Sequence, residues 1–477
     1  MEFIGREQEL SRLESIWSEP GIKGCSVVGR RQIGKSTLLK VFSQGKHCFQ
    51  IQFSRGSPAE NLCYFRDRVS LFLGRDVPET DMLTDLFMSV AEGCHDGPTL
   101  VILDELPYLV EDFPQAASIV QRFIDRDLEG MDVMVVICGS SMGMMRELVE
   151  NRNSPLYGRI DRKVDVGPLT FDQCCRFHPD MDRVDVLKLY MTLGGVPKYH
   201  VRMRGRTYGD CIRRHFIEDD TMIDEGTRII TDELSPGSRY TEVVFFISRG
   251  EVKQNRIAGR MGLDTANCKR YLDDLERIGV VSKREPMLNA PLRPYYVISD
   301  PMVDFHFSVL YKWRQTIGGT MDPDMVYGMM EHDIDTFLGK RFESFCGEWL
   351  DRVMNVKRRG TWWGRVDDTD TDIDIVADVV DGGLFVHTLL VECKFRRNKV
   401  GFSAYNDLVQ RGEAAGAGDN TRYMIISISG FDTRLEEYAE DNGVILIGPD
   451  ELVGDALSEE GWVRDSMVRL GMRRGSV

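Results

Sequence analysis

The chain has no long run of apolar residues, no clustered cysteines and no excess of positive charge. None of its apolar stretches approaches the roughly 20 residues that a membrane-spanning helix needs, so we expect no transmembrane segment and no membrane partner. The eleven cysteines are scattered, and their one close pair, Cys174-Cys175, has the spacing of neither a zinc site nor a small disulfide scaffold. The formal net charge of −16 argues against attraction of the whole surface to nucleic acid, so any such binding requires a local patch.

The amino terminus also lacks a basic segment followed by an apolar one, so no signal peptide is expected. Together with scattered cysteines, this favours a cytoplasmic protein. A chain of 477 residues is too long for one core, and we expect about three domains. Its 42% hydrophobic and 29% charged residues are ordinary for a globular protein.

One motif near the amino terminus indicates phosphate binding. A short apolar run, Cys25–Val28, precedes it, and a helical pattern from Ser36 to Phe42 follows. In a strand–loop–helix context, glycines allow a tight turn whose N–H groups point at phosphate oxygens. Lys35 would reach the β- and γ-phosphates, and the Ser36 hydroxyl would ligate Mg²⁺. The residues expected to bind the nucleotide here are Gly29, Arg30, Arg31, Gln32, Ile33, Gly34, Lys35, Ser36 and Thr37.

A second apolar run, Thr99–Leu103, ends in Asp104 and Glu105. This is the pattern of a buried parallel strand whose carboxyl end meets a ligand. Asp104 would complete the magnesium site, and Glu105 would polarise the attacking water as a general base. A solvated strand end is the alternative.

Three further polar positions lie within reach of a nucleotide in this pattern. Ser140 or Ser141, after the strand Asp132–Cys138, is a candidate sensor of the γ-phosphate, with a helix N-cap as the alternative. Arg159 follows a turn and would stabilise transition-state charge, in cis or from a neighbouring subunit, unless it forms a surface ion pair. Arg6 would lie near the nucleotide base or cap a helix.

Together, six motifs resemble the archaeal-type ATPases, P-loop proteins akin to the AAA+ and STAND classes. The motifs are Phe3-Ile4-Gly5-Arg6-Glu7, Gly29–Ser36, Leu103-Asp104-Glu105, Gly139-Ser140-Ser141, Leu156-Tyr157-Gly158-Arg159 and Gly194-Gly195-Val196-Pro197-Lys198-Tyr199. The resemblance implies ATP as the nucleotide, a helical lid after the core and a winged helix after the lid. In related lids the Gly194–Pro197 turn lies beside the nucleotide, so Pro197 is a candidate sensor of nucleotide state or a plain turn.

Residues 240–298 predict three short helices followed by a β-hairpin, the order of a winged helix-turn-helix. The third helix would present Thr265, Asn267, Lys269 and Arg270 outward. Lys283, Arg284 and Arg293 of the wing would meet phosphates if the module binds DNA. Acidic residues on the third helix, Asp273, Asp274 and Glu276, leave an intramolecular or partner-docking role equally open.

The last third of the chain contains a second candidate site. Thr371–Ala377 alternates polar and apolar residues like a half-buried strand, Asp381-Gly382-Gly383 predicts a hairpin turn, and Leu389–Phe395 returns. The hairpin would bring Asp374 and Glu392 together to share Mg²⁺ or Mn²⁺, with Lys394 beside them to orient the attacking water. A solvated acidic strand is the alternative.

The Asp374 and Glu392-Cys393-Lys394 pattern resembles the restriction-endonuclease-like nucleases, and Glu343 matches the first-helix glutamate of that pattern. Gln410 is expected on a helix that faces this site. The resemblance implies a multidomain α/β protein with a P-loop NTPase core (1–168), a helical lid (169–234), a winged helix with a connecting helix (235–320) and a restriction-endonuclease-like α/β domain (321–477).

The sequence thus predicts an ATPase that uses Mg²⁺ and acts on DNA. The alternative is an ATP-dependent switch that controls protein partners, in which the C-terminal domain only binds. The oligomeric state is open, with a homo-oligomer or a protein partner both compatible with the sequence.

Overall fold

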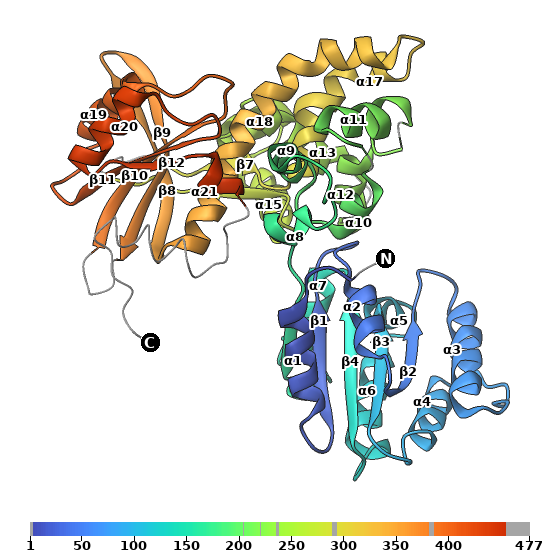
Figure 1. The fold of residues 1–477 in the computed structure, drawn as a ribbon. Coiled ribbons are helices and arrows are strands. Elements are labelled where there is room, and N and C mark those ends of the chain that lie inside the picture. Colours follow the sequence, from blue (N-terminus) through green and yellow to red (C-terminus); the bar gives the residue numbers. More distant parts are fainter. Residues whose placement is uncertain are drawn as a thin grey trace. The chain divides into compact units, whose positions relative to one another are not determined.

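The computed structural model describes residues 3–203, 205–219, 221–234, 238–288, 293–380 and 386–454. The chain forms two compact units (Figure 1). Unit 1 comprises Met1–Phe177 and the return segment Gly195–Arg202. Unit 2 comprises His178–Gly194 and Met203–Val477, so it holds most of the lid and all of the winged-helix and C-terminal segments. No helix of the described ranges is long and apolar enough to cross a membrane.

Unit 1 is built on a parallel five-stranded sheet with the order β2-β3-β4-β1-β5 (Figure 1). The strands are β1 (Lys23–Val28), β2 (His47–Gln52), β3 (Thr99–Asp104), β4 (Val133–Gly139) and β5 (Arg162–Asp165). The helices are α1 (Glu7–Trp17), α2 (Lys35–Phe42), α3 (Pro58–Leu73), α4 (Leu83–Glu92), α5 (Leu106–Asp112), α6 (Ala116–Arg122), α7 (Met142–Val149), α8 (Phe171–Cys175) and α10 (Pro197–Arg202), with a π-helical turn at Phe123–Asp127.

Both faces of this sheet are buried, which explains why its central strands are continuously apolar. In β3, Leu100 and Ile102 pack in one cluster with α1 and α2. Val101 and Leu103 pack in the opposite cluster with helices α3 to α7. Alternating side chains therefore serve two layers, as expected of a parallel sheet covered by helices. The predicted P-loop NTPase architecture is confirmed.

The helical part of unit 2 contains the segments expected for the lid, the three-helix module and its hairpin. The elements are α9 (Arg183–Leu193), α11 (Tyr208–Ile212), α12 (Glu225–Glu233), α13 (Ser238–Ser248), α14 (Gln254–Met261), α15 (Thr265–Arg277), β6 (Val281–Arg284), β7 (Tyr295–Ile298), α16 (Pro301–Phe305), α17 (Tyr311–Ile317) and α18 (Pro323–Val353), with π-helical turns at Arg213–Glu218 and His306–Leu310. His306 is buried between Ile223 and Thr227, as predicted for a core histidine.

Helix α18 begins much earlier than the predicted start near Gly339. Asp322 caps it by accepting hydrogen bonds from the N–H groups of Asp324 and Met325, and Pro323 occupies the first turn. The predicted start missed this cap and proline, although the buried stripe of Val326, Met330 and Ile334 already runs through the first half of the helix.

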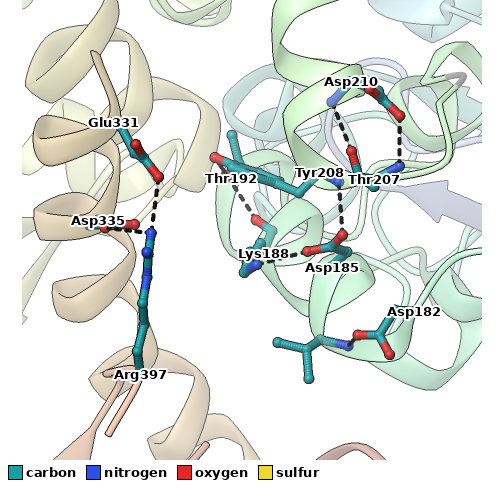
Figure 2. Close-up of polar contacts among 11 residues, drawn as sticks. Asp182, Asp185, Lys188, Thr192, Thr207, Tyr208, Asp210, Glu331, Asp335 and Arg397 are labelled. Atoms are coloured by element: carbon teal, nitrogen blue, oxygen red, sulfur yellow. Dashed lines mark hydrogen bonds and ion pairs between the residues drawn. The ribbon is translucent and has the colours of Figure 1, made fainter. Parts of the chain in front are cut away.

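Polar contacts connect helix α9 to α11 and tie the loop after β10 to α18 (Figure 2). Asp185 of α9 accepts from the backbone N–H of Tyr208 and pairs with Lys188. The Thr192 and Tyr208 hydroxyls lie 3.1 Å apart inside the unit. Arg397 reaches Glu331 of α18 at 2.9 Å. The lid helix and the C-terminal segment thus belong to one packed body.

The C-terminal part of unit 2 is a mixed five-stranded sheet with the order β12-β11-β10-β9-β8 (Figure 1). Its elements are β8 (Val356–Val366), β9 (Thr369–Val380), β10 (Val386–Lys394), α19 (Phe402–Ala414), β11 (Thr421–Ser427), α20 (Thr433–Asn442), β12 (Ile445–Ile447) and α21 (Pro449–Val453). Strands β9 and β10 pair antiparallel as predicted, whereas β11 joins β10 in parallel. The turn expected at Asp381-Gly382-Gly383 lies outside the described residues.

The wing of the three-helix module pairs with the edge strand of this sheet. The N–H of Thr361 on β8 donates to the Glu285 carbonyl at 3.1 Å, and the N–H of Met287 donates to the Thr361 carbonyl at 3.0 Å. Met287 is 2% exposed and packs with Trp362 in the sheet's core. The segment after β6 therefore covers an edge that would otherwise expose unpaired backbone groups.

Gly360 makes this pairing possible, because a Cβ atom there would lie 2.3 Å from the Glu285 carbonyl oxygen. We expect Gly360→Ala to separate the two segments at a cost of about 1–3 kcal/mol. Amide hydrogen exchange should show lost protection at Thr361 and Met287. The matched control is Gly328→Ala on α18, where a Cβ meets nothing within 4 Å. It should keep that protection, and unchanged exchange in Gly360→Ala would contradict the packing argument.

Candidate functional site

The predicted phosphate loop follows β1 and turns directly into α2. Gly34 has φ +98°, a conformation that favours glycine, and it caps the helix at Lys35. A Cβ atom at Gly29 would lie 2.4 Å from the Val166 carbonyl oxygen. Both glycines are therefore required by the backbone, and the first N–H groups of α2 are left to bind an anion.

Lys35 lies folded into this loop. Its Nζ donates to the carbonyls of Gly29 at 2.7 Å and Arg30 at 2.9 Å, and the residue is only 5% exposed. Among the described residues no acidic side chain forms an ion pair with this ammonium, which is held by carbonyl dipoles. The loop thus presents one concentrated positive charge suited to phosphate oxygens.

Ser36 and Asp104 meet across the sheet as the sequence predicts for a magnesium site. The Ser36 hydroxyl donates to Asp104 Oδ2 at 2.8 Å. Asp104 is 1% exposed, and its Oδ1 atom has no hydrogen-bond partner among the described residues. A buried carboxylate oxygen without a partner is costly, and a hard divalent cation would satisfy it. These two side chains therefore fit Mg²⁺.

The Glu105 side chain is held at the carboxyl end of β4, the neighbouring strand. Its backbone is left-handed, with φ +54°, and its Oε2 accepts from the N–H of Ser140 at 3.0 Å. Strands β3 and β4 are parallel neighbours, so their carboxyl ends meet at one edge. Ser141 instead caps α7 by accepting from the Met144 N–H. The structure thus separates two alternatives: Ser140 faces the site, and Ser141 is the cap.

These residues surround a pocket of about 560 Å³. Its lining comprises Arg31, Gln32, Gly34, Lys35, Ser36, Thr37, Gln52, Phe53, Ser54, Arg55, Glu105, Tyr108, Ser140 and Lys198. Gly29, Arg30 and Ile33 of the predicted loop do not line the pocket. The Ile33 side chain is 1% exposed and packs in the core with α1 and α2. The predicted role of Ile33 in nucleotide binding is therefore confined to its backbone.

Six pocket residues were not predicted as site residues: Gln52, Phe53, Ser54, Arg55, Tyr108 and Lys198. Gln52 ends β2 beside Asp104 of β3, so the rule that ligands meet the carboxyl ends of parallel strands would have found it. Lys198 follows Pro197, whose ring lies against Gly34. Arg6 is also buried and donates to the Ile33 carbonyl at 3.0 Å, so it supports the loop from behind.

Arg159 does not lie in the pocket of its own chain. Its Nε is 2.9 Å from both carboxylate oxygens of Asp125, and its carbonyl packs on Gly24 at the start of β1. At about 3.3 Å per strand residue, Gly24 is about 16 Å from Gly29. Arg159 therefore forms the surface ion pair left open as an alternative, at the end of the sheet opposite the phosphate loop. The predicted role in cis is corrected, and action in trans stays a prediction.

The second cluster of charged side chains lies where β9 and β10 separate. Their ladder ends at the pair Ile375 and Val391, and the carboxylate of Asp374 then accepts the N–H of Cys393 at 2.7 Å. Glu392 is 3% exposed, and Lys394 contacts one of its oxygens. The structure thus brings Asp374, Glu392 and Lys394 together.

Helix α18 adds Glu343 to this cluster. Burial and the nearby carboxylate of Asp372 raise the pKa of Glu343 to about 7. Burial, followed by the charges of Glu392 and Glu343, raises the pKa of Asp374. Like charges crowded in a buried site are relieved by a bound cation, so Asp374 and Glu392 are a donor pair that fits Mg²⁺ or Mn²⁺. Within the described ranges, no group of three or more His, Cys, Asp or Glu side chains is arranged to hold a metal ion.

Arg411 of α19 is the cluster's unpredicted member. Its Nη2 lies 2.8 Å from Glu392 Oε2, and its Nη1 donates to the Asp372 carbonyl at 2.7 Å. Gln410, the residue expected to face the site, is exposed instead. The error is one position on a helix, which turns a side chain by about 100°.

Comparisons with known proteins agree with this geometry. Residues 3–203 match a family described as an ATPase domain predominantly from Archaea, and residues 306–404 match one described as archaeal and bacterial proteins of unknown function. The chain is similar to the uncharacterized protein MJECL04 of Methanocaldococcus jannaschii, with 24% identity over 438 residues that cover 89% of this chain and 95% of that protein.

Two solved structures are also similar. The Walker-type ATPase PABY2304 of Pyrococcus abyssi has 19% identity and a TM-score of 0.51, covering 64% of this chain and 96% of its own. The ORC2 protein of Aeropyrum pernix has 13% identity and a TM-score of 0.45, covering 70% of this chain and 95% of its own. The ATPase family model that matches residues 3–203 supports the predicted ATP binding and hydrolysis, and the Pyrococcus abyssi structure supports the fold.

The position of Glu105 predicts a separation of binding from hydrolysis. Glu105→Gln should keep nucleotide affinity and lower the rate of ATP hydrolysis by about 10²–10⁴-fold, because the amide cannot take a proton from water. Phosphate release and binding of a fluorescent ATP analogue measure the two properties. The matched control is Glu129→Gln, an exposed glutamate outside the pocket. Hydrolysis at the wild-type rate in Glu105→Gln would remove Glu105 from the mechanism.

The placement of Arg159 predicts that its loss leaves nucleotide binding intact. In dilute solution, Arg159→Ala should bind ATP with wild-type affinity, since its guanidinium pairs with Asp125 far from the loop. Hydrolysis measured over a range of protein concentrations then tests the role in trans. If Arg159→Ala hydrolyses ATP more slowly only at protein concentrations where wild-type activity rises, the role in trans is supported. If the variant binds ATP more weakly at high dilution, the placement of Arg159 outside the pocket is contradicted.

Proposed function

We propose that the chain is a Mg²⁺-dependent ATPase that acts on DNA, with a metal-dependent phosphodiesterase site in its C-terminal sheet. The observation that carries the DNA part is the convergence of Asp374, Glu392 and Lys394 at the end of the β9–β10 ladder, with Glu343 supplied by α18. Carboxylates beside a lysine match what cleavage of a phosphodiester requires, a cation site and a positive charge near the attacking water.

In the ATPase site, Lys35 neutralises the β- and γ-phosphate oxygens, and Ser36 and Asp104 hold Mg²⁺. Glu105 takes a proton from the water that attacks the γ-phosphorus. Ser140 aligns Glu105 through its N–H and lies in the pocket lining, where its hydroxyl would respond to the γ-phosphate. Lys35, Ser36, Glu105 and Ser140 line the pocket, and Asp104 is hydrogen-bonded to Ser36.

In the C-terminal site, a divalent cation would supply an activated water and stabilise charge on the scissile phosphate. Asp374 and Glu392 would hold it, and Lys394 would orient the water. Arg411 keeps Glu392 in place from the side of α19. The exposed positions Thr265, Asn267, Lys269 and Arg270 on α15 support DNA as the substrate, because such side chains contact base edges and phosphates.

One observation favours a second candidate, an ATP-dependent switch that controls partner proteins and whose C-terminal domain does not cleave. Both oxygens of Glu392 already face cations of the same chain, Lys394 and Arg411. If these ion pairs persist, Glu392 is neutralised without a metal and serves packing alone. A partner, or a second copy of the chain that uses Arg159 in trans, would then transmit the nucleotide state.

Cleavage of supercoiled plasmid DNA separates the two candidates. With Mg²⁺ or Mn²⁺, in the presence or absence of ATP, the wild type should nick the plasmid, and Lys394→Ala should be slower by about 10²–10³-fold. The matched control is Lys399→Ala, an exposed lysine on the same segment after β10. It should cleave like the wild type. A wild type that never cleaves with any metal or nucleotide would favour the switch.

A further inference from the structure

A groove of about 390 Å³ lies between the wing and the edge strand of the C-terminal sheet, both in unit 2. Residues 282–285, from β6 and the position after it, form one wall, and residues 356–360 of β8 form the other. Asp351 of α18 completes the lining. Neither the ATPase pocket nor the carboxylate cluster includes these residues.

The groove is held open by packing on both sides. The backbone pairing of Glu285 and Met287 with Thr361 fixes the wing against β8. The rings of Tyr295 on β7 and Trp363 on β8 pack edge to face, with centroids 4.8 Å apart. These contacts join the two walls through backbone bonds and partly buried rings, so the groove is preformed rather than made by a ligand.

The lining is basic, although the chain as a whole carries a net charge of −16. It contains Lys283, Arg284, Lys357, Arg358 and Arg359 against the carboxylates of Glu285 and Asp351. Some of these cations pair nearby: Lys283 with Glu276, Arg359 with Asp351 and Arg358 with Asp378. Such partly exposed pairs contribute little and can be exchanged for a phosphate at small cost. This is the local patch that a strongly acidic chain needs in order to bind nucleic acid.

Helix α18 connects the groove to the carboxylate cluster. Arg284 donates to the Ser344 hydroxyl at 3.0 Å, and the Arg359 guanidinium packs on Gly347. Asp351 lies two turns along the same helix from Ser344, and Glu343 precedes Ser344. From Glu343 to Asp351 the helix spans about 12 Å, the rise of three to four base pairs of DNA. The basic wall and the carboxylates therefore share one supporting helix.

We propose that this groove binds the phosphate backbone of DNA and positions it beside the cluster of Asp374 and Glu392. The inference rests on the proposed action on DNA and adds the surface that holds the strand. It also changes the role expected of the wing. Lys283 and Arg284 act together with β8, whereas the exposed Arg293 does not line the groove.

The experiment measures binding without cleavage. The full-length chain is titrated into a fluorescently labelled DNA duplex of about 20 base pairs in EDTA, without nucleotide, at several salt concentrations. The double variant Lys357→Ala with Arg358→Ala should bind about tenfold more weakly, and its slope of log K against log salt should be smaller by about two. The matched control, Arg422→Ala with Arg434→Ala, removes two exposed charges of the same unit outside the groove and should bind like the wild type.

The single variant Lys357→Glu guards against a folding defect, because this lysine is exposed. It should weaken binding several-fold while its thermal unfolding matches that of the wild type. DNA binding by the wild type that is unaffected by either groove variant overturns the groove and leaves the proposed action on DNA standing. Equal weakening of DNA binding in the control variant of Arg422 and Arg434 also overturns the groove, since the loss of any exposed positive charge would then weaken binding. A wild type that does not bind DNA overturns both proposals.

Discussion

The hydrogen bond from Ser36 to Asp104 is the contact on which the first unit depends. It joins the first turn of α2 to the end of β3, so it holds the phosphate loop against the strand that supplies the acid pair. The parallel sheet makes this contact possible, because the carboxyl ends of neighbouring strands meet at one edge. The same edge places Glu105 against Ser140 and keeps Asp104 Oδ1 free of protein hydrogen bonds in the described structure. A single polar contact between the exposed Ser36 and the buried Asp104 thus places the two predicted magnesium ligands beside each other.

The second unit is organised by a different constraint, the covering of a sheet edge. Strand β8 would expose a row of backbone groups if the segment after β6 did not pair with Thr361. That pairing gives the wing an intramolecular contact and leaves Lys283 and Arg284 in the groove proposed to bind DNA. The docking also forms the basic groove, whose two walls come from the wing and from β8. Arg284 is partly buried and donates to the Ser344 hydroxyl of α18, and desolvation lowers its pKa while it still lines the groove.

Several residues show how far sequence reasoning reached. Motif spacing identified Lys35, Ser36, Asp104 and Glu105. Each lies within a few residues of a strand end, where the tight turn limits which residue types can stand beside it. Alternation along β9 and β10 likewise brought Asp374 to Glu392. The sequence predictions were wrong for side chains whose position depends on packing against residues far away in the chain. Arg159 follows a suitable turn but lies beside Gly24 at the far edge of the sheet, and Gln410 is one helical step from the contact that Arg411 makes.

The sequence by itself determined the chemistry that this protein carries: a phosphate loop, a strand-end acid pair and a Glu-x-Lys strand, because each depends on residues close in the chain. Only the tertiary structure decided which side chains share a space. It buried Ile33 in the core, brought Gln52 and Lys198 to the nucleotide pocket, and joined the wing to β8. These outcomes depend on contacts between segments far apart in sequence, whose free energy comes from packing and edge pairing that local patterns do not encode.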